Sequence, residues 1–200
     1  IDGLAHAWQT FNNCSSVGLL IALSRWDIHD TQERIAEATR PWNNRNGDND
    51  DKSVTLYELA DYASTKHGLI TYVRPNGSIE TLKKFIAADI PVVARALMYP
   101  DKDFVHYRVI RGYDDFARTI TESDGIEGPA ERYSYDEFDD CMKSGEIDAS
   151  DCAEYRVVGT KGNVRLDPAY EYAMKPKQCP TDRQEIQRPP VRRAPKEVKS

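Results

Sequence analysis

The chain lacks a long apolar run and has no excess of basic residues. Its longest apolar stretch, residues 17–23, has seven residues, whereas a membrane span needs about 20, so we expect no span. The 200 residues include 33 Asp or Glu and 27 Lys or Arg, which gives a formal net charge of −6. Nucleic acids and anionic membranes are bound through clustered cations. The acidic balance therefore argues against a nucleic acid as partner.

Cysteine is also scarce. The four cysteines are Cys14, Cys141, Cys152 and Cys179, and no two of them have C-x-x-C spacing. This excludes the zinc and redox motifs that are built on that spacing. Cys141 and Cys152 lie close together in a loop-rich region, where they either form a disulfide or remain two separate thiols. Cys179 is expected to stay unpaired.

A short acidic loop is similar to part of a calcium site. Asp48, Asp50 and Asp51 stand close together, as in part of a calcium-binding loop. They lack the glycine and the terminal glutamate spacing of an EF-hand. A solvated acidic loop fits the pattern better, and the sequence predicts no metal and no cofactor.

The composition predicts one folded domain followed by a tail. Hydrophobic residues make up 40 % of the chain and charged residues 30 %, which is typical of a globular protein. The end differs, because residues 175–200 hold eight Lys or Arg, three Asp or Glu, and five of the eleven prolines. We therefore predict a domain over 1–174 and a Pro-rich basic tail or linker over 175–200, which could attach a further domain or partner.

The start of the chain bears on its location. The first residue is Ile1 and not Met, which is consistent with a chain that has lost a signal peptide. Such a chain would be secreted or extracytoplasmic. A cytoplasmic location stays open as the alternative.

Helical patterns dominate the first half of the domain, and strand patterns dominate the second. Helices are expected over 14–26, 31–39, 54–67, 78–88 and 134–142, and strands over 69–74, 91–98, 104–113, 118–122 and 154–159. Helices first and strands second, without alternating βαβ units, predict an α+β fold. In this fold an N-terminal helical part packs against an antiparallel sheet.

Cys14 stands where the first long helix is expected to begin, with Asn13 as a suitable cap. Unpaired amides and the helix dipole at such a position favour an anion and lower the pKa of a thiol. Gln9 could point its side-chain amide at the same spot as the backbone amide of Cys14, and two such donors form an oxyanion hole. The alternative is a buried structural cysteine, the commoner role of a lone cysteine before an apolar helix.

His106 lies at the start of the most clearly patterned strand. Period-two alternation places His106 and Arg108 on the same face of that strand. A histidine in this position can accept a proton from a thiol across a cleft, and a half-exposed strand histidine is the alternative. His6 and His29 have no evident partner in the sequence, and His67 fits the C-terminus of a helix.

Asp124 follows the next expected strand, eighteen positions after His106. A hairpin return would bring its carboxylate back beside the histidine, where it would fix the ring orientation and stabilise the imidazolium. Asp114 and Asp115 fall at the opposite end of the His106 strand. The alternative for Asp124 is a turn residue before Gly125.

The order Gln, Cys, His, Asp resembles that of papain-like cysteine peptidases, and in particular the bacteriocin-processing, double-glycine leader peptidase-like family. That family shows Gln, a short gap, and Asn/Asp-Cys-Gly-Pro-Ala opening a helix. His-Trp/Tyr-Val-Val with a Gly-Tyr-Asp and then Asp-Pro follow later in its chains. The matching segments here are 9–14, 106–114 and 123–125, and the resemblance covers about residues 1–160.

The resemblance implies a papain-like fold and a cysteine peptidase that hydrolyses a peptide or amide bond of a peptide or protein substrate through an acyl-enzyme. Cys14 would be the nucleophile, His106 the base, Asp124 its orienting partner and Gln9 an oxyanion donor. Ser15-Ser16 replace Gly-Pro after the cysteine, and Gly125 replaces the proline. These departures keep open a catalytically inactive papain-like binding module. A related amidase or acyltransferase also stays open, because it shares the acyl-enzyme step.

Overall fold

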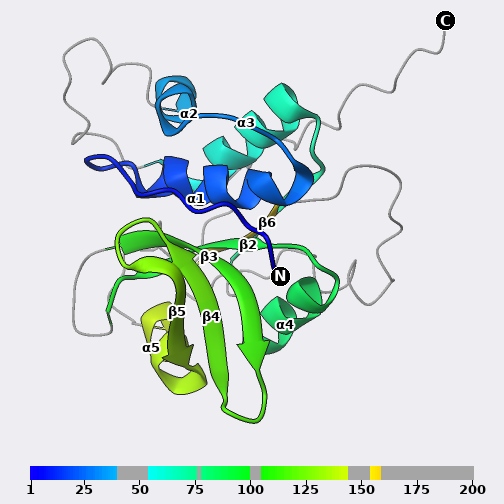
Figure 1. Ribbon diagram of the computed structural model, residues 1–200, viewed down its shortest axis with the longest axis vertical. Helices are drawn as coiled ribbons and strands as arrows, with labels where there is room; N and C mark the ends of the chain where they lie inside the picture. The colour runs from blue at the N-terminus through cyan, green and yellow to red at the C-terminus, as the bar shows by residue number, and fades with distance from the viewer. Residues whose placement is uncertain (40–53, 76–77, 100–104, 144–153, 159–200) are drawn as a thin grey trace, which may run out of the picture.

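The computed structural model describes residues 1–39, 54–75, 78–99, 105–143 and 154–158 (Figure 1). In chain order the helices are α1 (Cys14–Leu23), a 3-10 turn (Ser24–Trp26), α2 (Gln32–Thr39), α3 (Leu56–His67), α4 (Ile79–Ala87) and α5 (Tyr135–Lys143). The strands are β1 (Thr71–Pro75), β2 (Val92–Leu97), β3 (Val105–Asp114), β4 (Thr119–Asp124), β5 (Gly128–Ser134) and β6 (Glu154–Val158).

The described elements form three layers, in which one sheet lies between two groups of helices. The six strands lie in the order β1-β6-β2-β3-β4-β5, and every pair is antiparallel. Helices α1, α2 and α3 lie on one side of the sheet, with α4 and α5 beyond it (Figure 1). The α+β fold, with its N-terminal helical part against an antiparallel sheet, is thereby confirmed.

Two hydrophobic clusters join these layers. In β3 the apolar residues alternate between them, because Tyr107 and Val109 pack with α1, α2 and α3 while Ile110 packs with α4 and α5. Successive side chains of a strand point to opposite faces, so one strand serves both cores. The face that carries Ile110 also carries His106 and Arg108.

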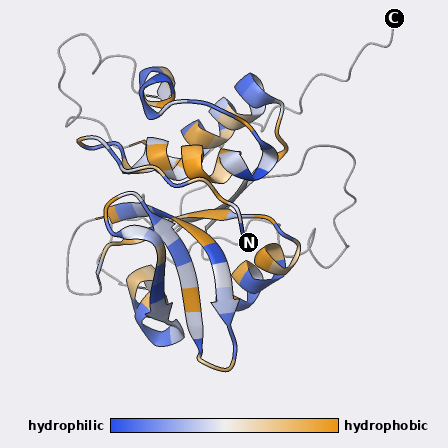
Figure 2. Ribbon diagram, viewed as in Figure 1, coloured by the Kyte–Doolittle hydropathy of each residue, from blue (hydrophilic) through white to orange (hydrophobic). Residues whose placement is uncertain are grey.

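Helix α1 is the central helix of the fold because it is apolar along most of its length (Figure 2). All of its residues except Cys14 and Leu20 are buried. Val17, Leu19 and Ile21 are at most 1 % exposed. A helix that is hydrophobic all round is buried on all sides, and α1 accordingly lies between α2 and α3 and the sheet (Figure 1). This burial fixes the place of Cys14 at its first residue.

Helix α3 is capped at both ends, whereas the expected cap of α1 is not formed. Thr55 and Glu58 form a capping box at the start of α3, and Gly68 ends that helix in the left-handed conformation, as such caps typically do. Asn13 departs from expectation, because it occupies the N-cap of α1 without capping through its side chain. Its amide instead donates to the Thr10 hydroxyl at 2.6 Å.

The sequence does not predict strand β5, because its patterns indicate no helix or strand between 123 and 133. Its residues, GPAERYS, contain almost no apolar alternation, and most of them are exposed or half-buried. It is the edge strand beside β4. An edge strand is fixed by ladder hydrogen bonds to its neighbour and needs little side-chain burial, so hydrophobic periodicity misses it.

Several sequence predictions fall outside the described residues. These are the acidic loop at 48–51, Cys152, Cys179 and the tail over 175–200. Cys141 is described as a buried free thiol on α5. Within the described ranges, no helix has the length and apolar character required to cross a bilayer.

Candidate active site

Cys14 is the first residue of α1 and so lies at the N-terminal end of that helix. Its side chain is partly exposed, whereas the other residues of the first turn, Ser15 to Val17, are buried. The first N–H groups of a helix lack intrahelical acceptors, so this end favours a negative charge. No acidic residue occupies the first turn. The thiol of Cys14 is therefore the group that meets this positive end.

Gln9 lies against the turn that follows Asp124. Its backbone N–H donates to the Gly125 carbonyl at 2.9 Å. A Cβ atom added to Gly125 would lie 3.2 Å from Gln9 Cβ and 2.5 Å from Val17 Cγ1. The turn after Asp124 thus touches both the Gln9 segment and the first turns of α1, and it joins segments that are far apart in sequence.

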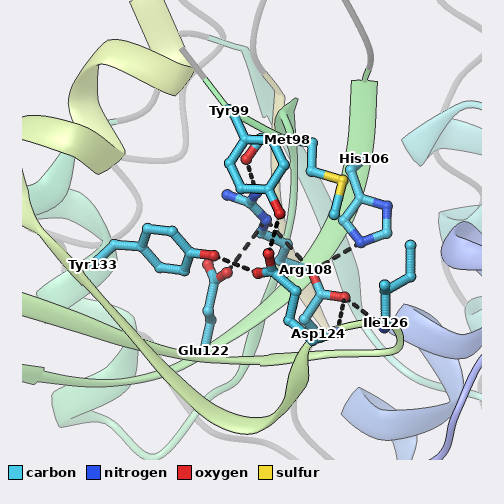
Figure 3. Close-up of polar contacts among 9 residues, drawn as sticks. Met98, Tyr99, His106, Arg108, Glu122, Asp124, Ile126 and Tyr133 are labelled. Atoms are coloured by element: carbon cyan, nitrogen blue, oxygen red, sulfur yellow. Dashed lines mark hydrogen bonds and ion pairs between the residues drawn. The ribbon is translucent and has the colours of Figure 1, made fainter. Parts of the chain in front are cut away.

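His106 and Asp124 form a buried pair at neighbouring ends of β3 and β4. His106 Nε2 lies 2.8 Å from Asp124 Oδ2, and the two side chains are 1 % and 0 % exposed (Figure 3). The other carboxylate oxygen, Oδ1, accepts the backbone N–H of Ile126 at 2.7 Å and that of Glu127 at 3.3 Å. The hairpin return expected from the sequence therefore does bring Asp124 to His106.

The Cys14 thiol also acts on the His106 ring. Burial disfavours the charged imidazole, but the interactions with Asp124 and Cys14 outweigh it and raise the pKa of His106 to about 9. Burial alone would raise the pKa of Asp124, yet its bonds with His106 and the backbone amides hold that pKa below the usual value. At neutral pH the pair is imidazolium and carboxylate.

The stability of the fold should fall as the pH rises through the pKa of His106. That pKa is 6.5 without the folded environment and about 9 within it, so the native state binds the proton more tightly. The contribution is fully present below about pH 6.5, is lost above about pH 9, and amounts to about 3 kcal/mol of unfolding free energy. Urea unfolding at pH 6.5 and 9.5 measures it. His106→Gln should remove the part of this dependence that His106 supplies. A smaller fall should remain, because burial raises the pKa of Glu122 to about 8 and this too lowers stability as the pH rises. An unchanged slope would contradict the assignment to His106.

A second layer of charged residues lies behind the His106–Asp124 pair. Arg108 Nε is 3.2 Å from Glu122 Oε1 and 3.5 Å from Asp124 Oδ2, and these three side chains are at most 2 % exposed (Figure 3). Burial raises the pKa of Glu122 to about 8, although Arg108 acts in the opposite direction. Sequence reasoning placed Arg108 on the His106 face but assigned it no role.

Three carboxyl groups come together here, from Glu122, Asp124 and Glu127. One oxygen from each lies within 4.8 Å of the others, a spacing that could suit a metal ion. Arg108, however, already supplies a positive charge to two of them. Glu127 accepts hydrogen bonds from the hydroxyls of Tyr99 and Tyr133. The positive charge of this cluster thus comes from a protein side chain, and its chemistry is that of an internal ion pair.

The remaining histidines lie outside the Cys14–His106–Asp124 arrangement. His67 pairs with Asp30 at 2.7 Å at the end of α3, a partner that the sequence did not reveal. His6 packs edge-to-face on Trp8 with ring centroids 4.8 Å apart. Burial lowers the pKa of His6 despite the nearby Asp124. His6 is therefore a neutral ring beside the site.

Comparison with known proteins agrees with this architecture. Residues 4–145 match the model of the Peptidase_C39 like family, and the chain belongs to that family. No curated protein matches the chain.

Solved structures share the fold. The peptidase domain of Streptococcus ComA, a bifunctional ABC transporter involved in quorum sensing, aligns with a TM-score of 0.56 at 12 % identity, over 78 % of this chain and 97 % of that one. A C39-like peptidase from Bacillus anthracis, described as putative, aligns with a TM-score of 0.57 at 14 % identity, over 80 % and 96 %. A double glycine motif protease from an AMS/PCAT transporter, in complex with the leader peptide, gives 0.52 at 14 %, over 78 % and 92 %.

Proposed function

We propose that the protein is a cysteine peptidase in which Cys14 is the nucleophile, His106 the proton carrier and Asp124 the group that orients His106. The observation that carries the proposal is the buried contact of 2.8 Å between His106 Nε2 and the Asp124 carboxylate, together with the action of the Cys14 thiol on the same ring. Membership of the Peptidase_C39 like family supports the same activity.

In the proposed mechanism Cys14 passes its proton to His106. Asp124 faces Nε2 of His106, so Nδ1 is the ring nitrogen left for the thiol. Transfer of the thiol proton to His106 gives a thiolate at the start of α1, where the helix dipole stabilises it. The imidazolium is stabilised in turn by the Asp124 carboxylate.

The reaction then follows an acyl-enzyme course. The thiolate attacks the substrate carbonyl carbon, and the oxyanion accepts hydrogen bonds from the Cys14 backbone amide and from the Gln9 side chain. His106 gives its proton to the leaving amine as the C–N bond breaks. A water molecule, deprotonated by His106, cleaves the thioester and returns the thiol.

The proposed substrate is a peptide or protein. One structural neighbour is a double glycine motif protease in complex with a leader peptide, which supports an extended peptide as the ligand class. Amidases and acyltransferases use the same acyl-enzyme step, so the product separates them from a peptidase.

Selective alkylation of Cys14 tests the proposal without knowledge of the substrate. At pH 5.5 an ordinary thiol of pKa about 8.5 is only about 0.1 % ionised, so fast alkylation at this pH requires a proton acceptor such as His106. Iodoacetamide should therefore label Cys14 about 100-fold faster in the native protein than in His106→Ala. Mass mapping of the labelled peptides measures the ratio.

Two controls interpret the labelling. Cys141, which is 1 % exposed, should react only after unfolding, and Cys14→Ser should remove the fast site. Equal and slow labelling of Cys14 in both proteins would contradict the proposal. Fast labelling without hydrolysis of any member of a peptide library would instead favour the binding module.

A further inference from the structure

Arg108 occupies a position on β3 that places it between the site and a second buried acid. Strands β3 and β4 pair with Val109 opposite Ser123 and Ile110 opposite Glu122. Continuing this register puts Arg108 opposite Asp124, on the face that also carries His106 and Glu122. The motif that the sequence resembles has valine where this chain has Arg108. The guanidinium is therefore a departure of this chain from that motif.

The guanidinium is held from several sides. Its Nη2 donates to the Met98 carbonyl beyond the end of β2. Its planar group lies over the Tyr133 ring, 5.1 Å from the centroid. Figure 3 shows it between Glu122 and Asp124, with ion pairs to both. A guanidinium fixed in this way presents its charge at a defined place.

Asp124 is the ionised partner of Arg108 over the pH range in which a thiolate–imidazolium pair would work. Burial raises the pKa of Glu122 to about 8, so below about pH 7 Glu122 is chiefly a neutral acid. The pKa of Asp124 is held low. Over this range the guanidinium of Arg108 and the His106 imidazolium therefore share the Asp124 carboxylate, whose Oδ2 faces both.

We propose that Arg108 is a positioning residue for the candidate active site. Its guanidinium binds the Asp124 carboxylate and so maintains both the charge and the place of the group that orients His106. Arg108 touches neither the thiol nor the substrate and acts only through Asp124. This inference rests on the proposed cysteine peptidase function.

The consequence is a dependence of Cys14 reactivity on Arg108 at low pH. An opposite charge within about 4–6 Å lowers the pKa of a carboxyl group by about 1–3 units. Without Arg108, Asp124 takes up a proton at a higher pH, the imidazolium loses its counter-charge, and the thiolate forms less readily. The acid limb of Cys14 reactivity should therefore move to higher pH.

The test compares Arg108→Met/Glu122→Gln with Glu122→Gln alone. The double variant removes the guanidinium together with the second buried acid that it faces, whereas Arg108→Met alone would leave two buried acids without their cation. The measurement is the rate of Cys14 alkylation by iodoacetamide between pH 4 and 8, with thermal unfolding as a check on folding. We expect the midpoint of the acid limb to lie at least one pH unit higher in the double variant, a loss of about tenfold at a fixed pH on the limb. Arg108→Lys/Glu122→Gln, which keeps the charge, should recover at least half of that shift.

The outcomes separate this inference from the proposed function. If Cys14 in the unaltered protein shows no His106-dependent labelling, both fail. If that labelling is present but the double variant and Glu122→Gln share one acid limb, Arg108 serves only to pair Glu122, and this inference alone is overturned. A shift that the lysine variant does not reduce would also overturn it, because the effect would then not follow the charge.

Discussion

Replacing Asp124 with asparagine should lower kcat/KM for peptide hydrolysis by about 10³- to 10⁴-fold while leaving the fold intact. Asp124 accepts from His106 at Oδ2 and from two backbone amides at Oδ1. Asparagine can keep the backbone contacts through its carbonyl oxygen, but its amide group then donates toward His106. The ring would be held in the wrong tautomer, and the imidazolium would lose its negative partner.

A matched control exists at the other buried His–Asp pair. Asp30 and His67 lie 2.7 Å apart, with side chains 3 % and 16 % exposed, and Asp30 also accepts the Tyr62 hydroxyl at 2.8 Å. Asp30→Asn perturbs a similar contact outside the site, so it should lower the thermal stability with less than a twofold change in kcat/KM. Comparable losses of activity in the two variants would show that Asp124 acts through stability and not through His106.

The arrangement of the site could be anticipated from the sequence because it depends on local signals. An apolar helix preceded by Asn13 fixes where Cys14 sits, and an alternating strand fixes the face of His106. One hairpin then decides where Asp124 returns. Each signal is short in range, and the antiparallel pairing of β3 and β4 joins them with a loop of only a few residues.

What could not be anticipated depends on partners that the local pattern does not specify. Asp30 meets His67 across 37 positions, and no periodicity links them. Arg108 and Glu122 stand at strand positions where apolar residues are expected. Their burial is explained only by the pairing of β3 with β4, which brings Arg108 and Glu122 together. Strand β5 could not be anticipated for the same reason, since it is fixed by pairing with its neighbour β4 and not by its own side chains.

Gly125 offers the second large effect, because there is no room for a side chain at this position. A Cβ atom would lie 2.5 Å from Val17 Cγ1 and 3.2 Å from Gln9 Cβ. Its backbone is outside the left-handed region, so space and not conformation requires glycine. Gly125→Ala should lower the unfolding free energy by about 1–3 kcal/mol, the usual cost of overpacking. Because Val17 is fully buried, we expect the contact to be relieved by a movement of α1 or of the Gln9 segment away from Asp124.

That movement predicts a loss of activity beyond the loss of stability. Val17 lies one turn after Cys14, so a shift of about 1 Å at the contact displaces the thiol relative to His106, a misplacement that can cost about 100-fold in rate. Gly18→Ala is the matched control, since its Cβ would make only ordinary contacts of 3.6 Å with Tyr107 and Val93, and alanine within a helix gains about 0.5–1 kcal/mol over glycine. Urea unfolding and the rate of Cys14 alkylation, measured on both variants at a temperature where each is folded, separate the two effects. If Gly125→Ala alkylates as fast as Gly18→Ala, the turn after Asp124 does not hold α1 in register with His106.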